Sequence, residues 1–298
     1  MLTRKKFIQQ SAVLAAVLMT DKPGLYKMHK DLGLQLYTVR DEIAKAKSLA
    51  ELDAILAKLS ATGYRQIELY GYYNRKYFGH TVKEMSDLLT KNHLKTPSGH
   101  YGLSDMLFAP EYKWDSWKYL LEDAKILGHK YVVIPYLDDK HRMADDFKRV
   151  AERLNKGGEL SKAAGLITGY HNHNFEFEMN DGITHYEYLL KNTDPSLVKF
   201  EMDLYWVKYA EQNPMDWFKK YPGRFPLWHI KDMEAKTEGK PKGQTCEAGN
   251  GIINWKEIFA EQKTAGLDYA FVEQEQYTRP VFDCIKISAD YMKKNLLK

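Results

Sequence analysis

The amino-acid sequence predicts one large α/β domain with the (β/α)8, or TIM, barrel fold. From residue 32 to the C-terminus, short apolar runs alternate with longer segments in which apolar residues recur at helical spacing. Roughly eight such pairs follow one another without a change in composition, which is typical of a (β/α)8 barrel. The chain has 298 residues, of which 44% are apolar, so it is long enough for this fold and can bury a core.

The expected strands are short and apolar. In the first half of the chain they cover residues 32–37, 64–70, 94–100 and 131–135. In the second half they cover residues 166–171, 198–203, 225–230 and 269–274. The segment 131–135, YVVIP, is an unbroken apolar run and indicates a strand buried on both faces.

The expected helices lie between these strands. They cover residues 49–60, 82–92, 114–127, 144–164, 186–191, 214–221, 253–265 and 281–296. Glycines at 63, 128 and 165 follow three of them, as is typical where a helix ends. A doubly wound open sheet is the rival fold, but it would need a glycine-rich phosphate turn after an early strand, and LQLYTVRD is not one.

The first residues differ from the rest. Arg4, Lys5 and Lys6 precede a short apolar run at residues 11–19, which is the pattern of an export signal and is too short to span a bilayer. TRKKFIQ resembles a twin-arginine signal in which Lys replaces the second Arg. We therefore expect residues 1–25 to be an export signal, residues 30–298 to form the barrel, and the protein to be periplasmic. The alternative is an N-terminal amphipathic helix on a cytoplasmic protein.

The composition narrows the classes of partner. The net charge is only +4, with Lys and Glu interspersed, so a nucleic-acid footprint is not expected. Cys246 and Cys284 are the only cysteines, too few for a disulfide framework. The expected partner is a small molecule, and the sequence leaves a homodimer open.

Polar and metal-capable residues occupy the ends of nearly all the expected strands. Active sites of such barrels lie at the carboxyl ends of the strands. The residues there are Tyr37, Arg40, Glu68, Tyr70, His100, Tyr101, His171, Asn172, His173, Asp203, His229, Lys231, Glu273 and Glu275. In the segment GYHNHNFEF, strand alternation directs His171 and His173 to one face.

Four of these residues should converge above the barrel as metal ligands: His171, Asp203, His229 and Glu273. Two imidazoles with two carboxylates suit Mn²⁺, Co²⁺, Fe²⁺ or Zn²⁺. Each residue also has a structural alternative. One imidazole of the His171/His173 pair could only hydrogen-bond a backbone carbonyl. Asp203 could cap the following turn, His229 could be a hydrogen-bonded core histidine, and Glu273 could pair with Lys231 or Arg279.

The segments YTVRD, GYHNHNFEF, EMDLYW, WHIKD, EAGNGIINW and FVEQE follow one another in this order. As a set they resemble the sugar-phosphate isomerase/epimerase family, which has a xylose-isomerase-like barrel, over about residues 32–296. The resemblance implies one divalent metal held at the ends of strands five to eight. The matching positions are again His171, Asp203, His229 and Glu273.

One position departs from the family pattern. Keto-sugar epimerases of this family carry a Glu on strand five that works with the strand-eight Glu as a two-base pair, and this chain has His171 there. The YHNH pattern is similar to that of keto-inositol dehydratases and of relatives that cleave 3-keto-glycosides by elimination.

The resemblance implies a metal-dependent enzyme acting on a keto-sugar by proton abstraction next to a metal-bound carbonyl. The outcome is isomerisation or epimerisation, or alternatively β-elimination as in a lyase or dehydratase. A non-catalytic sugar-binding barrel and a nuclease of the endonuclease IV type are the other readings; the near-neutral charge argues against the nuclease.

The candidate catalytic residues are Glu273, Lys231, His173, Glu176 and Glu275. Glu273 is expected to be a ligand that doubles as base, and Lys231 to stabilise negative charge on oxygen. Residues expected to shape the sugar pocket are Tyr37, Glu68, His100 and Trp206, with Tyr101.

Overall fold

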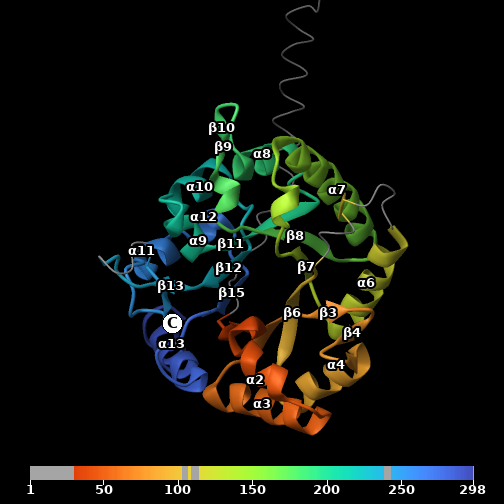
Figure 1. Cartoon of the computed structure of the whole chain (residues 1–298), viewed down its shortest axis with the longest axis vertical. Helices are drawn as coiled ribbons and strands as arrows, with labels where there is room; N and C mark the ends of the chain where they lie inside the picture. Colours follow the sequence, from red (N-terminus) through yellow and green to blue (C-terminus); the bar gives the residue numbers. More distant parts are fainter. Residues whose placement is uncertain (1–29, 103–106, 109–113, 238–242, 298) are drawn as a thin grey trace, which may run out of the picture.

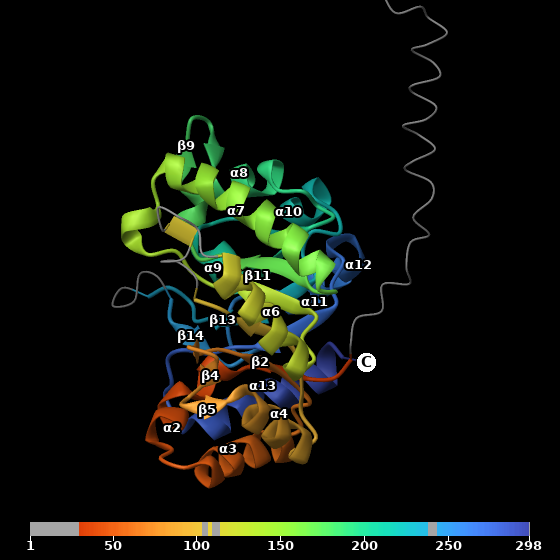
Figure 2. The ribbon, with the colours of Figure 1, turned by 90° about the vertical axis from the view of Figure 1, so that its right-hand side faces the viewer.

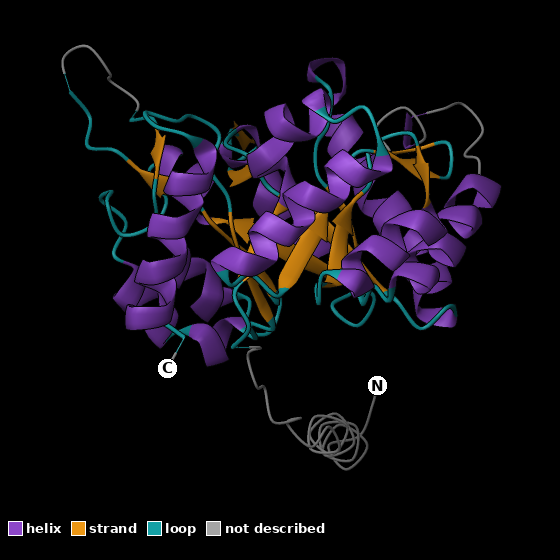
Figure 3. Cartoon of the chain, turned by 90° about the horizontal axis from the view of Figure 1, so that it is seen from below, coloured by secondary structure: helices purple, strands orange, loops and turns teal. Residues whose placement is uncertain are grey.

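The computed structural model describes residues 30–102, 107–108, 114–237 and 243–297. Eight parallel strands form a closed barrel in the order β1-β15-β12-β11-β8-β7-β6-β2, and helices surround it (Figures 1 and 3). The predicted fold is therefore confirmed. The export signal predicted for residues 1–25 lies outside the described residues. Among the described helices, none is long and apolar enough to cross a membrane.

The barrel strands follow the predicted ranges closely. They are β1 Gly33–Gln35, β2 Gln66–Leu69, β6 Lys95–His100, β7 Tyr131–Ile134, β8 Ile167–His171, β11 Val198–Asp203, β12 Leu227–Ile230 and β15 Tyr269–Val272. The strand β1 is shorter than expected because a 3-10 turn, Leu36–Val39, follows it at once. The side chain of Gln35 caps this turn by accepting a hydrogen bond from the backbone N–H of Tyr37.

The surrounding helices also match. They are α3 Leu49–Thr62, α4 Val82–Lys91, α6 Trp114–Leu127, α7 Ala144–Ala163, α8 His185–Asn192, α10 Pro214–Lys220, α11 Trp255–Ala260, α12 Gln262–Ala265 and α13 Val281–Asn295. Ser48 and Glu51 form a capping box at the start of α3, and Thr81 and Glu84 form another at α4. The single helix expected over residues 253–265 is interrupted at Glu261, between α11 and α12.

Several short elements were not predicted. They are α2 Arg40–Lys45, α9 Leu204–Tyr209, and the strands β3 Tyr72–Tyr73, β4 Lys76–Tyr77, β5 His80–Thr81, β9 Met179–Asn180, β10 Ile183–Thr184, β13 Asp232–Met233 and β14 Thr245–Cys246. They are too short for a periodic pattern to reveal them. The β9–β10 hairpin projects beside α8 (Figures 1 and 2).

The barrel interior is packed at one end and polar at the other. Tyr131, Val133, Leu227 and Phe271 form a buried apolar cluster from β7, β12 and β15. Further along these strands and their neighbours, the inward positions are occupied by His and Glu side chains. The apolar cluster therefore closes one end of the barrel, and the polar layers open at the carboxyl ends of the strands.

Candidate active site

Strand register decides which polar side chains meet. Asp203 at the end of β11 is the register partner of His229 on β12, and Glu201 is the partner of His171 on β8. Since side chains two residues apart on a strand share a face, Glu201 and Asp203 both point inward, with Glu201 one layer deeper. The inward groups thus lie in two layers that share His229.

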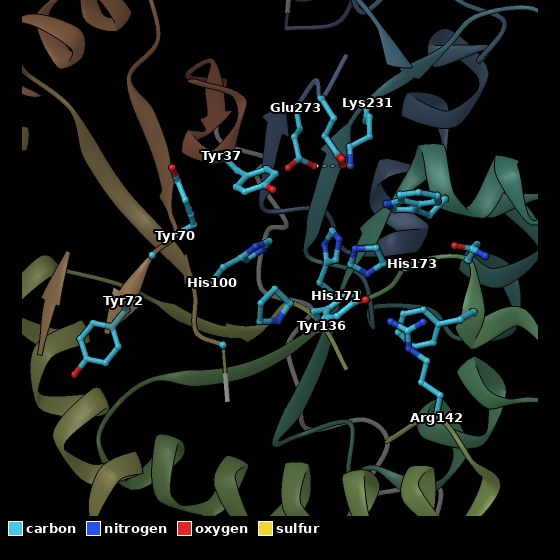
Figure 4. A pocket seen from close by; sticks show the side chains of 17 residues that line it. Tyr37, Tyr70, Tyr72, His100, Tyr136, Arg142, His171, His173, Lys231 and Glu273 are labelled. Atoms are coloured by element: carbon cyan, nitrogen blue, oxygen red, sulfur yellow. Dashed lines mark hydrogen bonds and ion pairs between the residues drawn. The ribbon is translucent and has the colours of Figure 1, made fainter. Parts of the chain in front are cut away.

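A cavity of about 610 Å³ opens at these strand ends, a size ordinary for a small-molecule site. Figure 4 shows Tyr37, His100, His171 and His173 around it, with Lys231 and Glu273 forming an ion pair. The predicted site residues that line the cavity are Tyr37, His100, His171, His173, Trp206, Lys231, Glu273 and Glu275. The structure therefore brings most of the predicted site together.

The upper layer is organised around the ammonium group of Lys231. Its Nζ lies 3.0 Å from Asp203 Oδ2, 2.9 Å from Glu273 Oε2 and 2.6 Å from Glu275 Oε1. His229 Nδ1 lies 2.9 Å from Glu273 Oε2 and 3.9 Å from Asp203 Oδ2. Three of the structural alternatives are thus also present. Glu273 pairs with Lys231, and His229 is fully buried with both ring nitrogens in hydrogen bonds. Asp203 Oδ1 caps α9 by accepting hydrogen bonds from two backbone N–H groups.

The lower layer joins three imidazoles to two carboxylates. Glu201 Oε2 lies 2.6 Å from His100 Nε2, 3.0 Å from His171 Nδ1 and 3.3 Å from His229 Nε2. Glu68 Oε2 lies 2.6 Å from His229 Nε2 and 3.2 Å from His100 Nε2. Each of these five side chains has a fractional exposure of 11% or less.

The surroundings of the three imidazoles shift their pKa values in opposite directions. Burial lowers the pKa of His100, but the neighbouring carboxylates of Glu68 and Glu201 outweigh it and raise the pKa to about 9. The pKa of His229 is likewise raised well above its usual range, since Glu201 and Glu273 outweigh burial. Burial and the nearby His229 lower the pKa of His171 well below its usual range.

The carboxylates of the upper layer are also perturbed. Burial raises the pKa of Asp203 to about 6, although Lys231 and His229 act in the opposite direction. For Glu273, Lys231 and His229 outweigh burial and hold its pKa far below the usual range. Glu273 is thus an anion paired with Lys231.

His173 stands apart from both layers. It lines the cavity, and its Nδ1 is buried with no hydrogen-bond partner among the described residues. Its ring lies 5.4 Å from that of Trp206 and 5.2 Å from that of Tyr136. Burial and the nearby Lys231 lower its pKa to about 3, so His173 is a neutral imidazole facing the cavity.

Three residues predicted to reach a substrate lie elsewhere. Glu68 is fully buried beneath the cavity, where Gln35 and Ser98 donate hydrogen bonds to it. Glu176 is also fully buried and accepts hydrogen bonds from the Tyr170 hydroxyl and the His173 backbone N–H. The hydroxyl of Tyr101 contacts His129 Nδ1 at 3.0 Å. The prediction that these residues contact a substrate is therefore wrong, because they lie behind the cavity wall.

The sequence analysis missed Glu201, Tyr136 and Arg142. Glu201 could have been found, because it lies two residues before Asp203 in the same strand and shares its face. Arg142 and Tyr136 follow the end of β7 in a segment without a pattern. Arg142 lines the cavity with its guanidinium 3.7 Å from the ring centre of Phe175.

The residues present fit a divalent metal. Two groups of side chains could each hold a metal ion, because the donor atoms within each group all lie within 4.8 Å of one another. The first group is His100, His171, Glu201 and His229, and the second is Asp203, His229 and Glu273. Glu201 Oε1 is buried and accepts no hydrogen bond from any described residue. A buried carboxylate oxygen normally has a partner, and mixed imidazole–carboxylate sets suit transition metals. Three of the four predicted ligands share the second group, and His171 falls in the first.

Comparison with known proteins identifies relatives for almost the whole barrel. A curated inosose dehydratase from Clostridium perfringens (strain 13) is 29% identical over 157 residues, which are 48% of this chain and 52% of that protein. The match thus spans about half the length of the curated relative. The crystal structure of a sugar phosphate isomerase/epimerase from Parabacteroides distasonis is 29% identical, with a TM-score of 0.76 over 90% of this chain and 99% of the other.

A more distant crystal structure, that of the IOLI protein with a bound zinc atom, has a TM-score of 0.66 and 16% identity, and covers 89% of this chain and 98% of the other. At that identity the likeness supports the fold alone. The family model of the xylose isomerase-like TIM barrel matches residues 56–294. The chain therefore belongs to the family of xylose isomerase-like TIM barrels.

Proposed function

We propose that this protein is a sugar-processing enzyme that removes a proton next to the carbonyl of a keto-sugar or keto-inositol and expels a β-oxygen substituent. The observation that carries the proposal is the composition of the cavity wall at the end of β8. There His171 and His173 line the cavity, and Glu176, the nearest acidic residue along the chain, is turned away to Tyr170. Among the described residues that line the cavity at the end of β8, none is a carboxylate that could serve as the second base of a two-carboxylate epimerisation.

Two kinds of group line the cavity. Glu273, Glu275 and Lys231 form a charged cluster, and the neutral imidazole of His173 lies near it. A divalent ion bound by residues of the two layers would polarise the substrate carbonyl and acidify the neighbouring C–H bond. Lys231 is placed to stabilise negative charge that develops on a substrate oxygen.

His173 is the proposed proton carrier. It lines the cavity and is uncharged at rest, since burial lowers its pKa to about 3. So low a pKa makes the imidazole a weak base, so removal of the α-proton depends on the acidification of the C–H bond by the bound ion. Once formed, the imidazolium is a strong acid and gives its proton up readily. One residue can therefore take the α-proton and deliver it to the departing β-oxygen, which an elimination requires.

The charges around the cavity favour an uncharged substrate. Lys231 and Arg142 are the Lys and Arg side chains on the described part of its wall. Lys231 is paired with three carboxylates, and Arg142 Nη1 lies 2.7 Å from Asp139 Oδ1. A phosphate group would have to compete with these carboxylates. The periplasmic location that we propose from residues 4–19 agrees with an unphosphorylated substrate.

Epimerisation or isomerisation is the second candidate function. It is supported by the Parabacteroides distasonis relative named sugar phosphate isomerase/epimerase, which covers 90% of this chain. In that case Glu273 and His173 would exchange the proton with the substrate, and the proton would return to carbon.

A proton NMR time course in D₂O separates these outcomes. Metal-loaded protein is incubated with ketohexoses, keto-inositols and 3-keto-glucosides. Elimination releases the β-substituent and produces a vinylic proton, whereas epimerisation introduces deuterium at the α-carbon of a recovered isomer. We expect His173→Gln to reduce kcat/KM by about 10²–10⁴-fold. The control is Asn174→Ala, which changes a neighbouring cavity residue. Exchange without elimination would support the second candidate, and no reaction on any substrate would leave a sugar-binding barrel.

A further inference from the structure

Arg40 joins the chain segments that follow the first and the last barrel strand. The parallel ladder between β1 and β15 ends with the pair Leu34 and Val272. Beyond that pair, Arg40 Nη2 donates a hydrogen bond to the backbone oxygen of Glu275 at 2.9 Å, and Nη1 donates to the backbone oxygen of Tyr37 at 3.3 Å. The guanidinium therefore continues the connection between the two segments past the ends of their strands.

Arg40 also contacts the ring of Tyr37. The guanidinium carbon lies 4.6 Å from the ring centre, which is within the range of a cation–π contact. The ring of Tyr70 meets the ring of Tyr37 edge-on, with centres 5.1 Å apart. Tyr37 nevertheless remains 40% exposed and lines the cavity (Figure 4). Arg40 and Tyr70 thus hold this ring at a place that a substrate can reach.

Glu275 is held at three points. Its backbone N–H donates a hydrogen bond to Thr245 Oγ1 at 3.0 Å, and its backbone oxygen accepts the bond from Arg40. Its Oε1 lies 2.6 Å from Lys231 Nζ. The side chain lines the cavity and is 27% exposed. Since a carboxylate offers about four acceptor positions, the contact with Lys231 leaves capacity for a hydroxyl group of the substrate.

We propose that Arg40 is a positioning residue for substrate binding. It places the ring of Tyr37 to pack against the substrate and the carboxylate of Glu275 to accept a hydrogen bond from a substrate hydroxyl. Arg40 is not among the described residues that line the cavity, so it acts through these two side chains. The proposal rests on the proposed function for the nature of the substrate, a keto-sugar or keto-inositol.

The geometry of the guanidinium group explains why an arginine serves here. It is planar, carries five N–H donors and stacks on aromatic rings, so one group can donate to two carbonyl oxygens and contact a ring. The ammonium group of lysine is a compact charge without that fork. Arg40→Lys therefore keeps the charge and removes the simultaneous contacts with Tyr37 and Glu275.

The kinetic test compares Arg40→Lys with a matched arginine. We expect Arg40→Lys to raise KM and to lower kcat/KM by about 10²-fold, as a displacement of about 1 Å in a site can. The control is Arg65→Lys, since Arg65 also donates to backbone oxygens, those of Ser60 and Tyr64, but lies before β2 at the other end of the barrel. Its kcat/KM should be unchanged.

A combination of variants separates positioning from a general structural role. In protein that already carries Tyr37→Leu and Glu275→Gln, adding Arg40→Lys should lower kcat/KM by no more than about twofold, because the side chains through which Arg40 acts are gone. A further loss of about 10²-fold in that background would overturn the proposal.

Hydrogen exchange gives a readout that needs no substrate. We expect the amides of Tyr37 and Glu275 to exchange faster in Arg40→Lys, with unchanged exchange in the remote helix α7. Unchanged exchange of both amides would overturn the positioning role of Arg40. Faster exchange of these amides, together with no turnover of any keto-sugar by the unaltered protein, would refute the proposed function and still support the positioning of Tyr37 and Glu275 by Arg40.

Discussion

Replacing Asp232 by Asn should destabilise the protein through one buried carboxylate. Asp232 follows Lys231 directly and is fully buried. Its Oδ2 accepts hydrogen bonds from Trp255 Nε1 at 2.7 Å and from the backbone N–H groups of Gly249 and Gly251 at 2.8 and 3.2 Å. Its Oδ1 accepts two more, from the backbone N–H groups of Met233 and Ile253. The carboxylate therefore fastens residues 249–255 to the barrel.

The expected loss of stability follows from the number of N–H groups that donate to Asp232. In Asp232→Asn the NH₂ group of the amide replaces either Oδ1 or Oδ2. The two N–H groups that donate to Oδ1, or the three that donate to Oδ2, then face another donor. Hydrogen bonds to a charged group contribute about 1.5–3 kcal/mol each. After partial relaxation, we expect a loss of about 3–5 kcal/mol in the free energy of unfolding, as for other broken buried charge networks. At roughly 2 °C per kcal/mol, Tm should fall by about 6–10 °C.

Urea unfolding followed by circular dichroism measures the loss. The control is Asp87→Asn, which breaks an exposed ion pair with Lys83 and should leave the urea midpoint unchanged. Hydrogen exchange should show faster exchange of the Gly249 and Gly251 amides in Asp232→Asn. An unchanged midpoint together with unchanged protection of these amides would refute the reasoning.

Three further predictions concern single side chains. Burial raises the pKa of Glu176 to about 7, so the folded state keeps a proton that the unfolded state releases. The free energy of unfolding should therefore fall by about 3 kcal/mol as pH rises from about 4.5 to 7. Urea titrations across this range should show that dependence on pH, and Glu176→Gln should lack it. A Cβ at Gly99 would lie 2.6 Å from His129 Cε1, so Gly99→Ala should lower stability by about 1–3 kcal/mol, and an unchanged urea midpoint would contradict this. Trp206 lines the cavity, so Trp206→Ala should raise KM about tenfold, equivalent to 1.4 kcal/mol, in steady-state assays; a change confined to kcat would argue against a binding role.

Much of the fold and part of the site follow from sequence alone. Periodicity placed the barrel strands to within a few residues, with β11 matching its expected range at both ends. Strand ends also indicated which side chains would line the cavity, including His171, His173 and Glu273. These successes have a local cause, because alternation within a strand depends only on neighbouring residues.

The tertiary structure decided how deep each group lies and which charges meet. Glu201 and Asp203 share a face by alternation, but only the register of β11 against β8 and β12 puts Glu201 beside His171 and Asp203 beside His229. The contact of Lys231 with Asp203 and Glu273 likewise joins the ends of three different strands. Such contacts depend on barrel closure and relative strand stagger, which no local pattern in the sequence encodes.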